Sequence, residues 1–355
     1  MELTVDLDRI VALSDFEPIA RERMDPAAYD YVAGGSWDEI TLAENVAAWR
    51  RYRFRPRVLR DIRTLDPGGT FLGRPSVVPV AIAPMAFQEL AHPEGETSMA
   101  AGAAAAGVPY CLSTSSSRTI EEVAAAAPAG DNWFQLYFVD TFETTQGLVE
   151  RAAASGFNAL MLTVDLPILG YREGIRRSGF VVPPLANVPA AVRRPNASTG
   201  LPTEDRSLSL TWADVDRIAG WSDLPLVLKG IMTPEDAGLA VEHGARAIVV
   251  SNHGARQLDR VPAPIDVLVE IVAAVDGRCE VWVDGGVRRG LDVLIAFALG
   301  ATGVLVGRPI YWALAAAGRS GVERAFAVLR DELEVALPLL GVASMREVRR
   351  EHLQP

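Results

Sequence analysis

The 355-residue sequence predicts an α/β fold in which a single (β/α)8 barrel makes up most of the chain. From residue 77 onward, eight short apolar runs alternate with Ala- and Leu-rich helical patterns. The runs are continuously apolar rather than alternating, as expected of parallel strands buried on both faces. A doubly wound sheet also alternates strands and helices, but the even spacing over eight units favours the barrel.

The predicted strands have clear limits. They cover residues 77–84, 108–114, 133–138, 159–165, 225–230, 247–253, 281–286 and 303–309. Helical patterns such as TQGLVERAAASG and PEDAGLAVEHG lie between them and end at glycine, a common residue just past a helix end. A last helical pattern, VERAFAVLRDELEVALPLLG, is expected to close the ring.

The domain prediction is one unit spanning residues 1–355. Residues 1–76 are expected to form an N-terminal helical segment on a barrel of residues 77–341. One connection, residues 171–210 after the fourth strand, is long and rich in proline and charge. Long loops in compact domains are usually functional or disordered, and this one follows a strand on the active-site side. We interpret it as a lid loop; a variable insertion is the alternative.

Composition excludes several classes of function. The apolar share of 49% and the charged share of 22% are those of a globular protein, and the net charge of −11 argues against nucleic-acid binding. Cys111 and Cys279 form neither a disulfide framework nor a zinc-ligand spacing. The N-terminus, MELTVDLDRI, is no signal peptide, and no apolar run is long enough to span a bilayer. We therefore expect a soluble cytoplasmic protein without a metal site or a membrane partner.

Polar residues at the predicted strand ends indicate an active site. The segment SNHGARQLD (251–259) places His253 and Arg256 directly after the sixth strand. Other strands end at Gln135, Tyr137, Thr163, Asp165, Lys229, Asp284 and Arg308. Because parallel strands of a barrel end on one rim, these groups should converge. One histidine could be structural, but so much charge from separate strands favours catalysis.

Two glycine-rich segments indicate a bound phosphate. DGGVRRG (284–290) and GRP (307–309) follow strands seven and eight, where barrels commonly bind phosphate. Glycine lets the backbone approach an anion, and Arg288 and Arg308 can add charge-assisted hydrogen bonds. We therefore predict a phosphate-bearing cofactor or substrate.

These segments, together with YDYVAGG (29–35), IAPMAFQELAHPEGE (82–96), LTVDLPILGYRE (162–173) and LPLVLKGIMTPEDA (224–237), resemble the FMN-dependent 2-hydroxy acid oxidase and dehydrogenase family. The resemblance runs nearly end to end and implies a TIM barrel, in agreement with the strand count. It also implies FMN as cofactor and an (S)-2-hydroxy acid as substrate.

The resemblance assigns roles to individual residues. His253 matches the base that takes the hydroxyl proton, and Asp165 matches the carboxylate that stabilises its protonated form. Tyr137 matches a tyrosine near the reacting hydroxyl, and Lys229 matches a lysine beside the flavin. Tyr31, Arg172 and Arg256 match the residues that bind the substrate carboxylate.

The remaining matches concern FMN. Those at the ring and ribityl chain are Pro84, Met85, Ala86, Ser113, Gln135, Thr163, Lys229 and Ser251. Those at the ribityl and phosphate end are Asp284, Gly285, Gly286, Arg288, Gly307 and Arg308. Asp259 has no match, and we expect it to serve local loop structure.

Two positions depart from the family pattern. Ser115, in LSTSSSRT, stands where glycolate oxidase has a bulky aromatic residue, so substrates larger than glycolate, including aromatic ones such as mandelates, are expected to fit. Tyr171 replaces the first arginine of the GRRE sequence of several relatives, although Arg172 is retained.

Several alternatives remain open from sequence. The electron acceptor is expected to be O2, giving H2O2, but a soluble dehydrogenase that uses a quinone or a carrier protein is the alternative. Lys229 would also suit a Schiff-base aldolase, and the same barrel could hold a flavin-dependent isomerase or a non-catalytic flavin binder. A homotetramer is expected by resemblance only.

Overall fold

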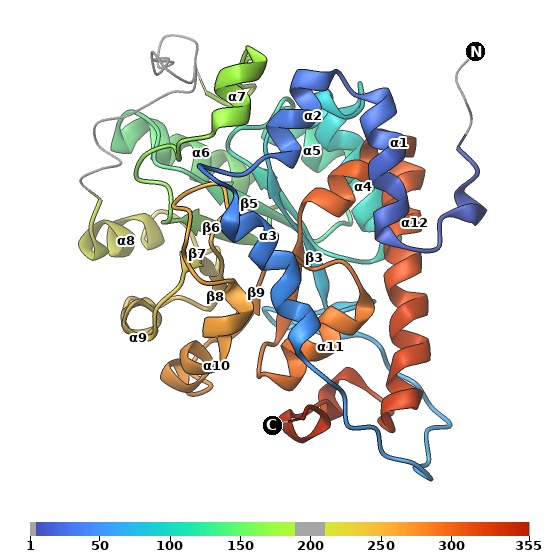
Figure 1. The fold of residues 1–355 in the computed structure, drawn as a ribbon. Coiled ribbons are helices and arrows are strands. Elements are labelled where there is room, and N and C mark those ends of the chain that lie inside the picture. The colour runs from blue at the N-terminus through green and yellow to red at the C-terminus, as the bar shows by residue number, and fades with distance from the viewer. Residues whose placement is uncertain (1–4, 189–209, 355) are drawn as a thin grey trace.

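A computed structural model describes residues 5–188 and 210–354 of the chain. In these residues eight parallel strands form a closed barrel with helices around it (Figure 1). The ring order runs from β3 through β9 in sequence, and β10 pairs with β3 to close it. The strands are β3 (Val80–Met85), β4 (Tyr110–Ser113), β5 (Asn132–Leu136), β6 (Ala159–Thr163), β7 (Leu226–Ile231), β8 (Ala247–Val250), β9 (Glu280–Val283) and β10 (Gly303–Val306). The predicted (β/α)8 barrel is confirmed.

The strands are buried on both faces, which explains their continuous apolar runs. In β7, for example, Val227 packs inside the barrel, whereas Leu226 and Leu228 pack in the layer beneath the surrounding helices. All three side chains are buried. The barrel interior and the helix layer are thus two separate apolar clusters that meet at each strand.

The helical ring follows the predicted alternation. Its members are α4 (Gly95–Ala106), α5 (Ile120–Ala126), α6 (Phe142–Ala154), α8 (Trp212–Ala219), α9 (Pro234–Glu242), α10 (Pro264–Val275), α11 (Gly290–Ala298) and α12 (Arg308–Leu340). The helix α12 is longer than the predicted closing helix and is broken near its middle, where Ala317 and Gly318 leave helical geometry. Among the helices of residues 5–188 and 210–354, none has the length and apolar character needed to cross a membrane.

The N-terminal segment is helical only in part. The helices α1 (Phe16–Arg23), α2 (Pro26–Ala33) and α3 (Ile40–Ala47) lie against the barrel (blue in Figure 1). A short hairpin, β1 (Gly69–Phe71) and β2 (Arg74–Ser76), then precedes β3. Sequence analysis missed this hairpin because strands of three residues have no detectable period.

The hairpin carries an aromatic plug for the amino end of the barrel. Phe71 packs edge-on against Trp133 and Trp282, with ring centroids 5.4 and 5.2 Å away. The two indole rings stack on each other at 5.0 Å. All three side chains are fully buried in the interior cluster, so large apolar groups fill this end of the barrel.

The first part of the predicted lid loop lies at the carboxyl end of the barrel. The helix α7 (Glu173–Ser178) follows β6, and Phe180 stacks on the ring of Tyr31 from α2 at 4.4 Å. Leu185 and Val188 line the cavity described below. Residues 189–209, the remainder of this loop apart from Leu210, lie outside the described residues.

Candidate active site

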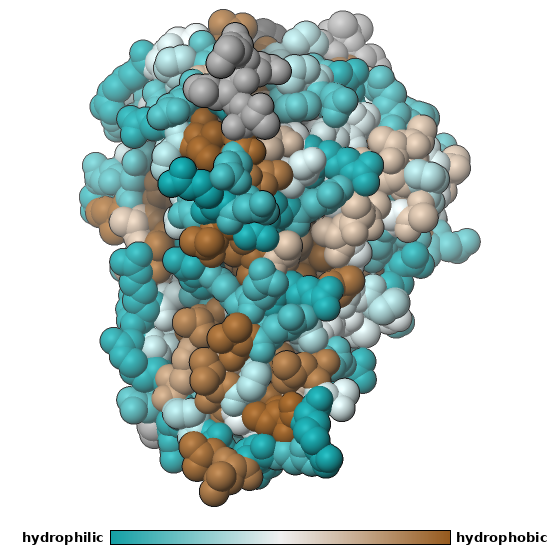
Figure 2. All heavy atoms as spheres, turned by 90° about the vertical axis from the view of Figure 1, so that its right-hand side faces the viewer, coloured by the Kyte–Doolittle hydropathy of each residue, from teal (hydrophilic) through white to brown (hydrophobic). Residues whose placement is uncertain are grey.

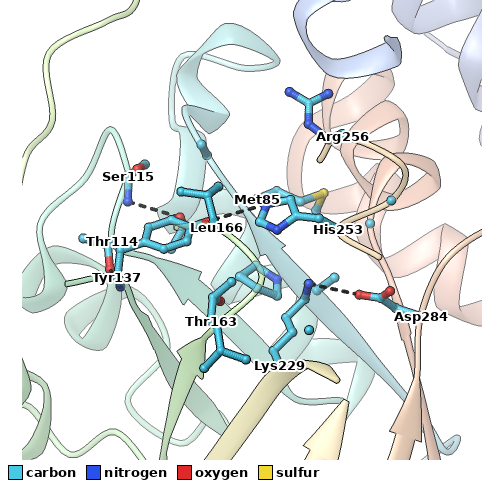
Figure 3. Close-up of a pocket in the computed structure, with 18 of the residues that line it drawn as sticks. Met85, Thr114, Ser115, Tyr137, Thr163, Leu166, Lys229, His253, Arg256 and Asp284 are labelled. Atoms are coloured by element: carbon cyan, nitrogen blue, oxygen red, sulfur yellow. Dashed lines mark hydrogen bonds and ion pairs between the residues drawn. The ribbon is translucent and has the colours of Figure 1, made fainter. Parts of the chain in front are cut away.

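A cavity of about 560 Å³ opens at the carboxyl ends of the strands (Figure 3). Its volume falls within the ~300–1,000 Å³ typical of cofactor and ligand pockets. The predicted residues that line it are Tyr31, Pro84, Met85, Ala86, Ser113, Tyr137, Thr163, Arg172, Lys229, His253, Arg256, Asp284, Gly285, Gly286, Arg288, Gly307 and Arg308. Residues from all eight strand ends and from α2 therefore meet at one place.

Three predicted residues, Gln135, Asp165 and Ser251, lie behind this lining and hold residues within it. Gln135 donates a hydrogen bond from Nε2 to the Thr163 hydroxyl at 3.0 Å, and the Lys229 ammonium donates one to the Ser251 hydroxyl at 2.9 Å. Asp165, the third of these residues, contacts His253. These residues therefore position lining groups rather than form the cavity wall.

The imidazole of His253 is bound on both nitrogens. Nδ1 lies 2.8 Å from Oδ1 of Asp165, and Nε2 lies 3.3 Å from the hydroxyl of Tyr137. Burial lowers the pKa of His253, against the opposing charge of Asp165. Burial acts to raise the pKa of Asp165, but the nearby His253 outweighs it and the pKa is lowered. The pair is therefore arranged as a neutral imidazole that a carboxylate can stabilise when it gains a proton.

The backbone at His253 adopts an uncommon conformation. His253, Gly254 and Ala255 have φ values of 59°, 62° and 62°, all in the left-handed region. Non-glycine residues in this region, here His253 and Ala255, are strained, and such residues cluster at functional sites. Asn252 holds this turn, since its Oδ1 accepts from the Ala255 amide and its side-chain amide pairs reciprocally with that of Asn45 in α3. Sequence analysis missed both asparagines, because nothing local marks a pairing across some 200 residues.

Two cationic side chains hold the end of α2. Arg256 donates to the carbonyl oxygens of Val32 and Gly34, at 3.2 and 2.9 Å. Arg308 donates to the same two oxygens, at 2.8 and 2.9 Å. Cations are favourable at a helix C-terminus, and here they fix the helix that carries Tyr31, whose ring centroid lies 5.0 Å from Cζ of Arg256.

The cavity has an excess of buried positive charge. Burial and the neighbouring arginine charges lower the pKa of Arg308 to about 9, and the pKa of Arg172 likewise to about 9. Burial also lowers the pKa of Arg288. Guanidinium groups destabilised in this way favour an anionic ligand. Arg308, a predicted phosphate ligand, here binds backbone carbonyls with all three of its nitrogen atoms.

The ammonium of Lys229 lies at the base of the cavity. Its Nζ is 3.3 Å from Oδ2 of Asp284. A dashed line marks this ion pair in Figure 3. Burial opposes the charge on Lys229, but Asp284 and Asp165 raise its pKa above the usual value. Oδ1 of Asp284 is buried and has no hydrogen-bond partner among the described residues.

The predicted phosphate glycines also serve packing. A Cβ on Gly286 would lie 1.8 Å from the carbonyl oxygen of Asn45, and its φ is 83°. The indole of Trp49 donates to the carbonyl of Gly285 at 2.9 Å. Glycine is therefore needed here for close approach of the N-terminal segment, whatever ligand the loop holds.

The residues present fit a cofactor with a polar ring and an anionic tail. The cavity offers a buried ammonium and, among the described residues, an unpartnered carboxylate oxygen at its base, and four arginines are among its lining residues. No group of three or more His, Cys, Asp or Glu side chains in residues 5–188 and 210–354 is placed to hold a metal ion. Fold and site together define a barrel enzyme that binds an anionic substrate and a phosphate-bearing organic cofactor.

Comparisons with known proteins give the family. Residues 20–355 match the model of the FMN-dependent dehydrogenase family. The chain is 46% identical to an L-lactate oxidase of Nostoc sp., covering 95% of this chain and 96% of that oxidase, and 45% identical to the glycolate oxidase of Spinacia oleracea, covering 97% and 95%. A solved structure of a mandelate oxidase with benzoyl-formic acid is 44% identical, covers 97% of this chain and 98% of its own, and superposes with a TM-score of 0.88.

The chain belongs to the FMN-dependent dehydrogenase family, and FMN is its cofactor. The family resemblance drawn from the sequence motifs is thereby confirmed. The chain is an oxidoreductase related over its full length to 2-hydroxy acid oxidases.

Proposed function

We propose that this chain oxidises an (S)-2-hydroxy acid to the 2-oxo acid, with His253 as the base. The observation that carries the proposal is the 2.8 Å contact of His253 with Asp165, beside a cavity rich in arginine. Nε2 of His253 takes the proton of the substrate hydroxyl, and Asp165 stabilises the imidazolium that forms. Tyr137, 3.3 Å from the same nitrogen, is placed to hydrogen-bond the reacting hydroxyl.

The substrate carboxylate binds to arginine. Arg256 and Arg172 both line the cavity near His253, and a guanidinium group can bind a carboxylate through two parallel hydrogen bonds. Tyr31, against which Arg256 packs, adds a hydroxyl to the same subsite. A carboxylate fixed here orients the 2-hydroxyl toward His253.

FMN, when bound, supplies the acceptor for the two electrons that leave the substrate α-carbon. Lys229 is placed to stabilise negative charge on the reduced ring, since Asp284 keeps its ammonium protonated. The residues proposed to hold FMN from the cavity wall are Pro84, Met85, Ala86, Ser113, Thr163, Lys229, Asp284, Gly285, Gly286, Arg288, Gly307 and Arg308, and Gln135 and Ser251 are proposed to act through Thr163 and Lys229. The ion pair disfavours the Schiff-base alternative, which needs a lysine with a lowered pKa.

We propose O2 as the second substrate, so that one 2-hydroxy acid and one O2 give one 2-oxo acid and one H2O2. The oxidase names of the relatives support this choice. A soluble dehydrogenase that passes the electrons to a quinone or a carrier protein is the second candidate.

The preferred substrates are proposed to be bulkier than glycolate. Ser115 lies in the cavity wall beside Tyr137 (Figure 3), where its small side chain leaves space. The wall continues into an apolar region made by Val139, Leu166, Leu169, Leu185, Val188, Trp212, Val215 and Ile218. An apolar side chain on the 2-hydroxy acid, aliphatic or aromatic as in mandelate, would lie against these residues.

The decisive experiment is a spectrum of the purified protein. A bound flavin band should bleach anaerobically on addition of an (S)-2-hydroxy acid, and admission of air should restore it with stoichiometric H2O2. A flavin that no 2-hydroxy acid reduces would contradict the proposed reaction. Bleaching without reoxidation by air, reversed instead by a quinone, would favour the dehydrogenase. Rates with glycolate, lactate, 2-hydroxyoctanoate and mandelate test the substrate range. A clear preference for glycolate would overturn the proposal that bulkier substrates are preferred.

A cytoplasmic homotetramer is the proposed assembly and location. Apolar side chains gather in patches on the face that carries α12, as Figure 2 shows. Val335 and Leu339 of α12 are exposed apolar residues. Patches of this kind mark interaction sites in soluble proteins. Light scattering of the purified protein would measure the number of chains directly.

A further inference from the structure

The two residues that serve His253 and the substrate carboxylate, Asp165 and Arg172, share one connection. Residues 164–172, which we call the β6 loop, run from the end of β6 to the start of α7. Main-chain bonds hold the loop near its ends, from the Val164 amide to the Lys229 carbonyl and from the Trp37 amide to the Tyr171 carbonyl. Between these points the loop contains no helix or strand to set its geometry.

Hydrogen bonds of the Gln257 side chain set the geometry of this part of the loop. Its Nε2 donates to the carbonyl oxygens of Asp165 and Ile168, at 3.0 and 2.8 Å. Its Oε1 accepts from the amide of Gly170 and from Nη2 of Arg172, both at 3.2 Å. Both donors and both acceptor positions of one amide are therefore used within the β6 loop.

The contact between Gln257 and the β6 loop is close and largely buried. Gln257 is 9% exposed, and a Cβ on Gly170 would lie 2.4 Å from the Arg256 carbonyl oxygen. That same carbonyl accepts a hydrogen bond from Nε of Arg172 at 3.0 Å. The β6 loop thus rests directly on the backbone that follows His253.

We propose that Gln257 is a positioning residue that holds Asp165 against His253 and holds Arg172 at the carboxylate subsite. The proposal rests on the proposed function, because it assigns Gln257 to the geometry of that reaction. Glutamine is suited to the position because it donates two hydrogen bonds and accepts two. No other single uncharged side chain of this length does so.

Two substitutions of Gln257 separate its effect on Asp165 from its effect on Arg172. Gln257→Leu removes all four bonds at similar volume and should lower kcat per bound flavin and raise KM. The expected loss in kcat/KM is roughly 10- to 100-fold, the range known for residues that orient metal ligands by hydrogen bonds. Gln257→Glu keeps the acceptor for Gly170 and Arg172 but replaces the donating nitrogen with a carboxylate oxygen, which faces the carbonyl oxygens of Asp165 and Ile168. It should lower kcat with a smaller rise in KM.

The matched controls are Gln146→Leu and Gln146→Glu in α6, where the side-chain amide of Gln146 donates a hydrogen bond to the exposed Glu150. Both controls should keep the parent kcat and KM. If Gln257 were merely structural, its variants would load less flavin but keep the parent KM and the parent kcat per bound flavin. That result would overturn the proposal.

Crystal structures of the FMN-loaded parent and of Gln257→Leu give a readout that needs no turnover. The His253–Asp165 distance should lengthen beyond roughly 3.5 Å in the variant, outside hydrogen-bond range. An unchanged distance would overturn the proposal. If the parent oxidised no 2-hydroxy acid, the proposed function would fail, yet this structural comparison would still decide the role of Gln257. Gln257→Glu serves the same comparison if the leucine variant does not fold.

Discussion

Nδ1 of His253 and Oδ1 of Asp165 lie 2.8 Å apart, although 88 positions separate the two residues in the chain. One follows β8 and the other follows β6, the two strands that pair with β7 on either side, so the parallel pairing of these three strands brings them together. Burial would by itself favour the neutral form of both groups. It prevails at His253, whose pKa is lowered despite Asp165, whereas at Asp165 the contact with His253 prevails and lowers the pKa of the carboxyl.

Asp165→Asn should lower kcat and move the acidic limb of the kcat/KM profile to lower pH. The base must be neutral, so activity falls as pH drops through the pKa of His253. Burial lowers that pKa, Lys229 and Arg172 lower it further, and Asp165 raises it. Removal of the carboxylate charge therefore lowers the pKa of His253 further, and the imidazolium loses its stabilising partner. We expect kcat to fall roughly 10²- to 10⁴-fold, the range of general-base effects. An acidic limb that stayed in place or moved upward would contradict this assignment.

Arg256→Lys should weaken substrate binding more than it slows the chemical step. Lysine keeps the charge but loses the planar two-point contact with a carboxylate. A lost charged hydrogen bond of about 1.5–3 kcal/mol corresponds to a rise in KM of roughly 10- to 150-fold. Because Arg256 also holds the carbonyls of Val32 and Gly34, Tyr31 should shift as well. Arg330→Lys, at an exposed pair with Glu334 on α12, is the control and should leave KM unchanged.

Lys229→Met should destabilise the protein and weaken FMN binding, because Asp284 would remain buried without its cation. Loss of one partner of a buried pair costs about 3–5 kcal/mol. The double variant Lys229→Met/Asp284→Asn should recover part of this loss, since no uncompensated charge remains. Urea midpoints of the flavin-free proteins measure the stabilities. Equal midpoints for the single and double variants would show that the pair is not coupled.

Ser115→Trp should shift substrate preference toward glycolate. The indole would occupy space beside Tyr137 that bulky side chains need, whereas glycolate has no side chain at its α-carbon. Discrimination in an apolar pocket reaches roughly 10- to 200-fold for small changes in size. The ratio of kcat/KM for mandelate to that for glycolate is the measured quantity. Ser115→Ala, which removes the hydroxyl without adding bulk, should leave that ratio nearly unchanged.

Asp259→Ala should reduce stability without changing kcat. The carboxylate of Asp259 accepts hydrogen bonds from the amides of Thr41 and Ile40, at 2.8 and 3.3 Å, and so caps the start of α3. Loss of an N-terminal cap costs about 0.5–2 kcal/mol. Asp38→Ala, which breaks only an exposed pair with Arg260, should cost less. A large fall in kcat for Asp259→Ala would show that this residue acts in the reaction.

Sequence reasoning identified the barrel and the groups that line its cavity because both depend on local signals. A strand buried on both faces is continuously apolar, and a polar site residue stands near its carboxyl end, as Lys229 does within β7, or directly after it, as Asp284 does after β9. The expectation that Asp259 serves loop structure also agrees with its place at α3. Parallel strands in one barrel then bring such residues to a common rim.

The features that sequence reasoning missed depend on long-range pairing. Nothing near Gln257 indicates that its amide bonds the β6 loop, and nothing near Asn252 indicates Asn45. Likewise, a buried arginine can bind a phosphate or a backbone carbonyl, and sequence alone does not distinguish the two for Arg308. The hydrogen bonds that Asn252 and Gln257 of SNHGARQLD make with distant parts of the chain were therefore visible only in the fold.

The aromatic plug has a consequence for how the chain folds as it is synthesised. Phe71 emerges from the ribosome early, but Trp282, one of its two partners, follows only after more than half of the chain has been made. A contact so distant in sequence forms late, because the intervening chain must first be ordered. Until then apolar side chains at the amino end of the growing barrel are exposed, and incomplete chains can associate through them. The hairpin that seals the barrel therefore completes its packing near the end of synthesis.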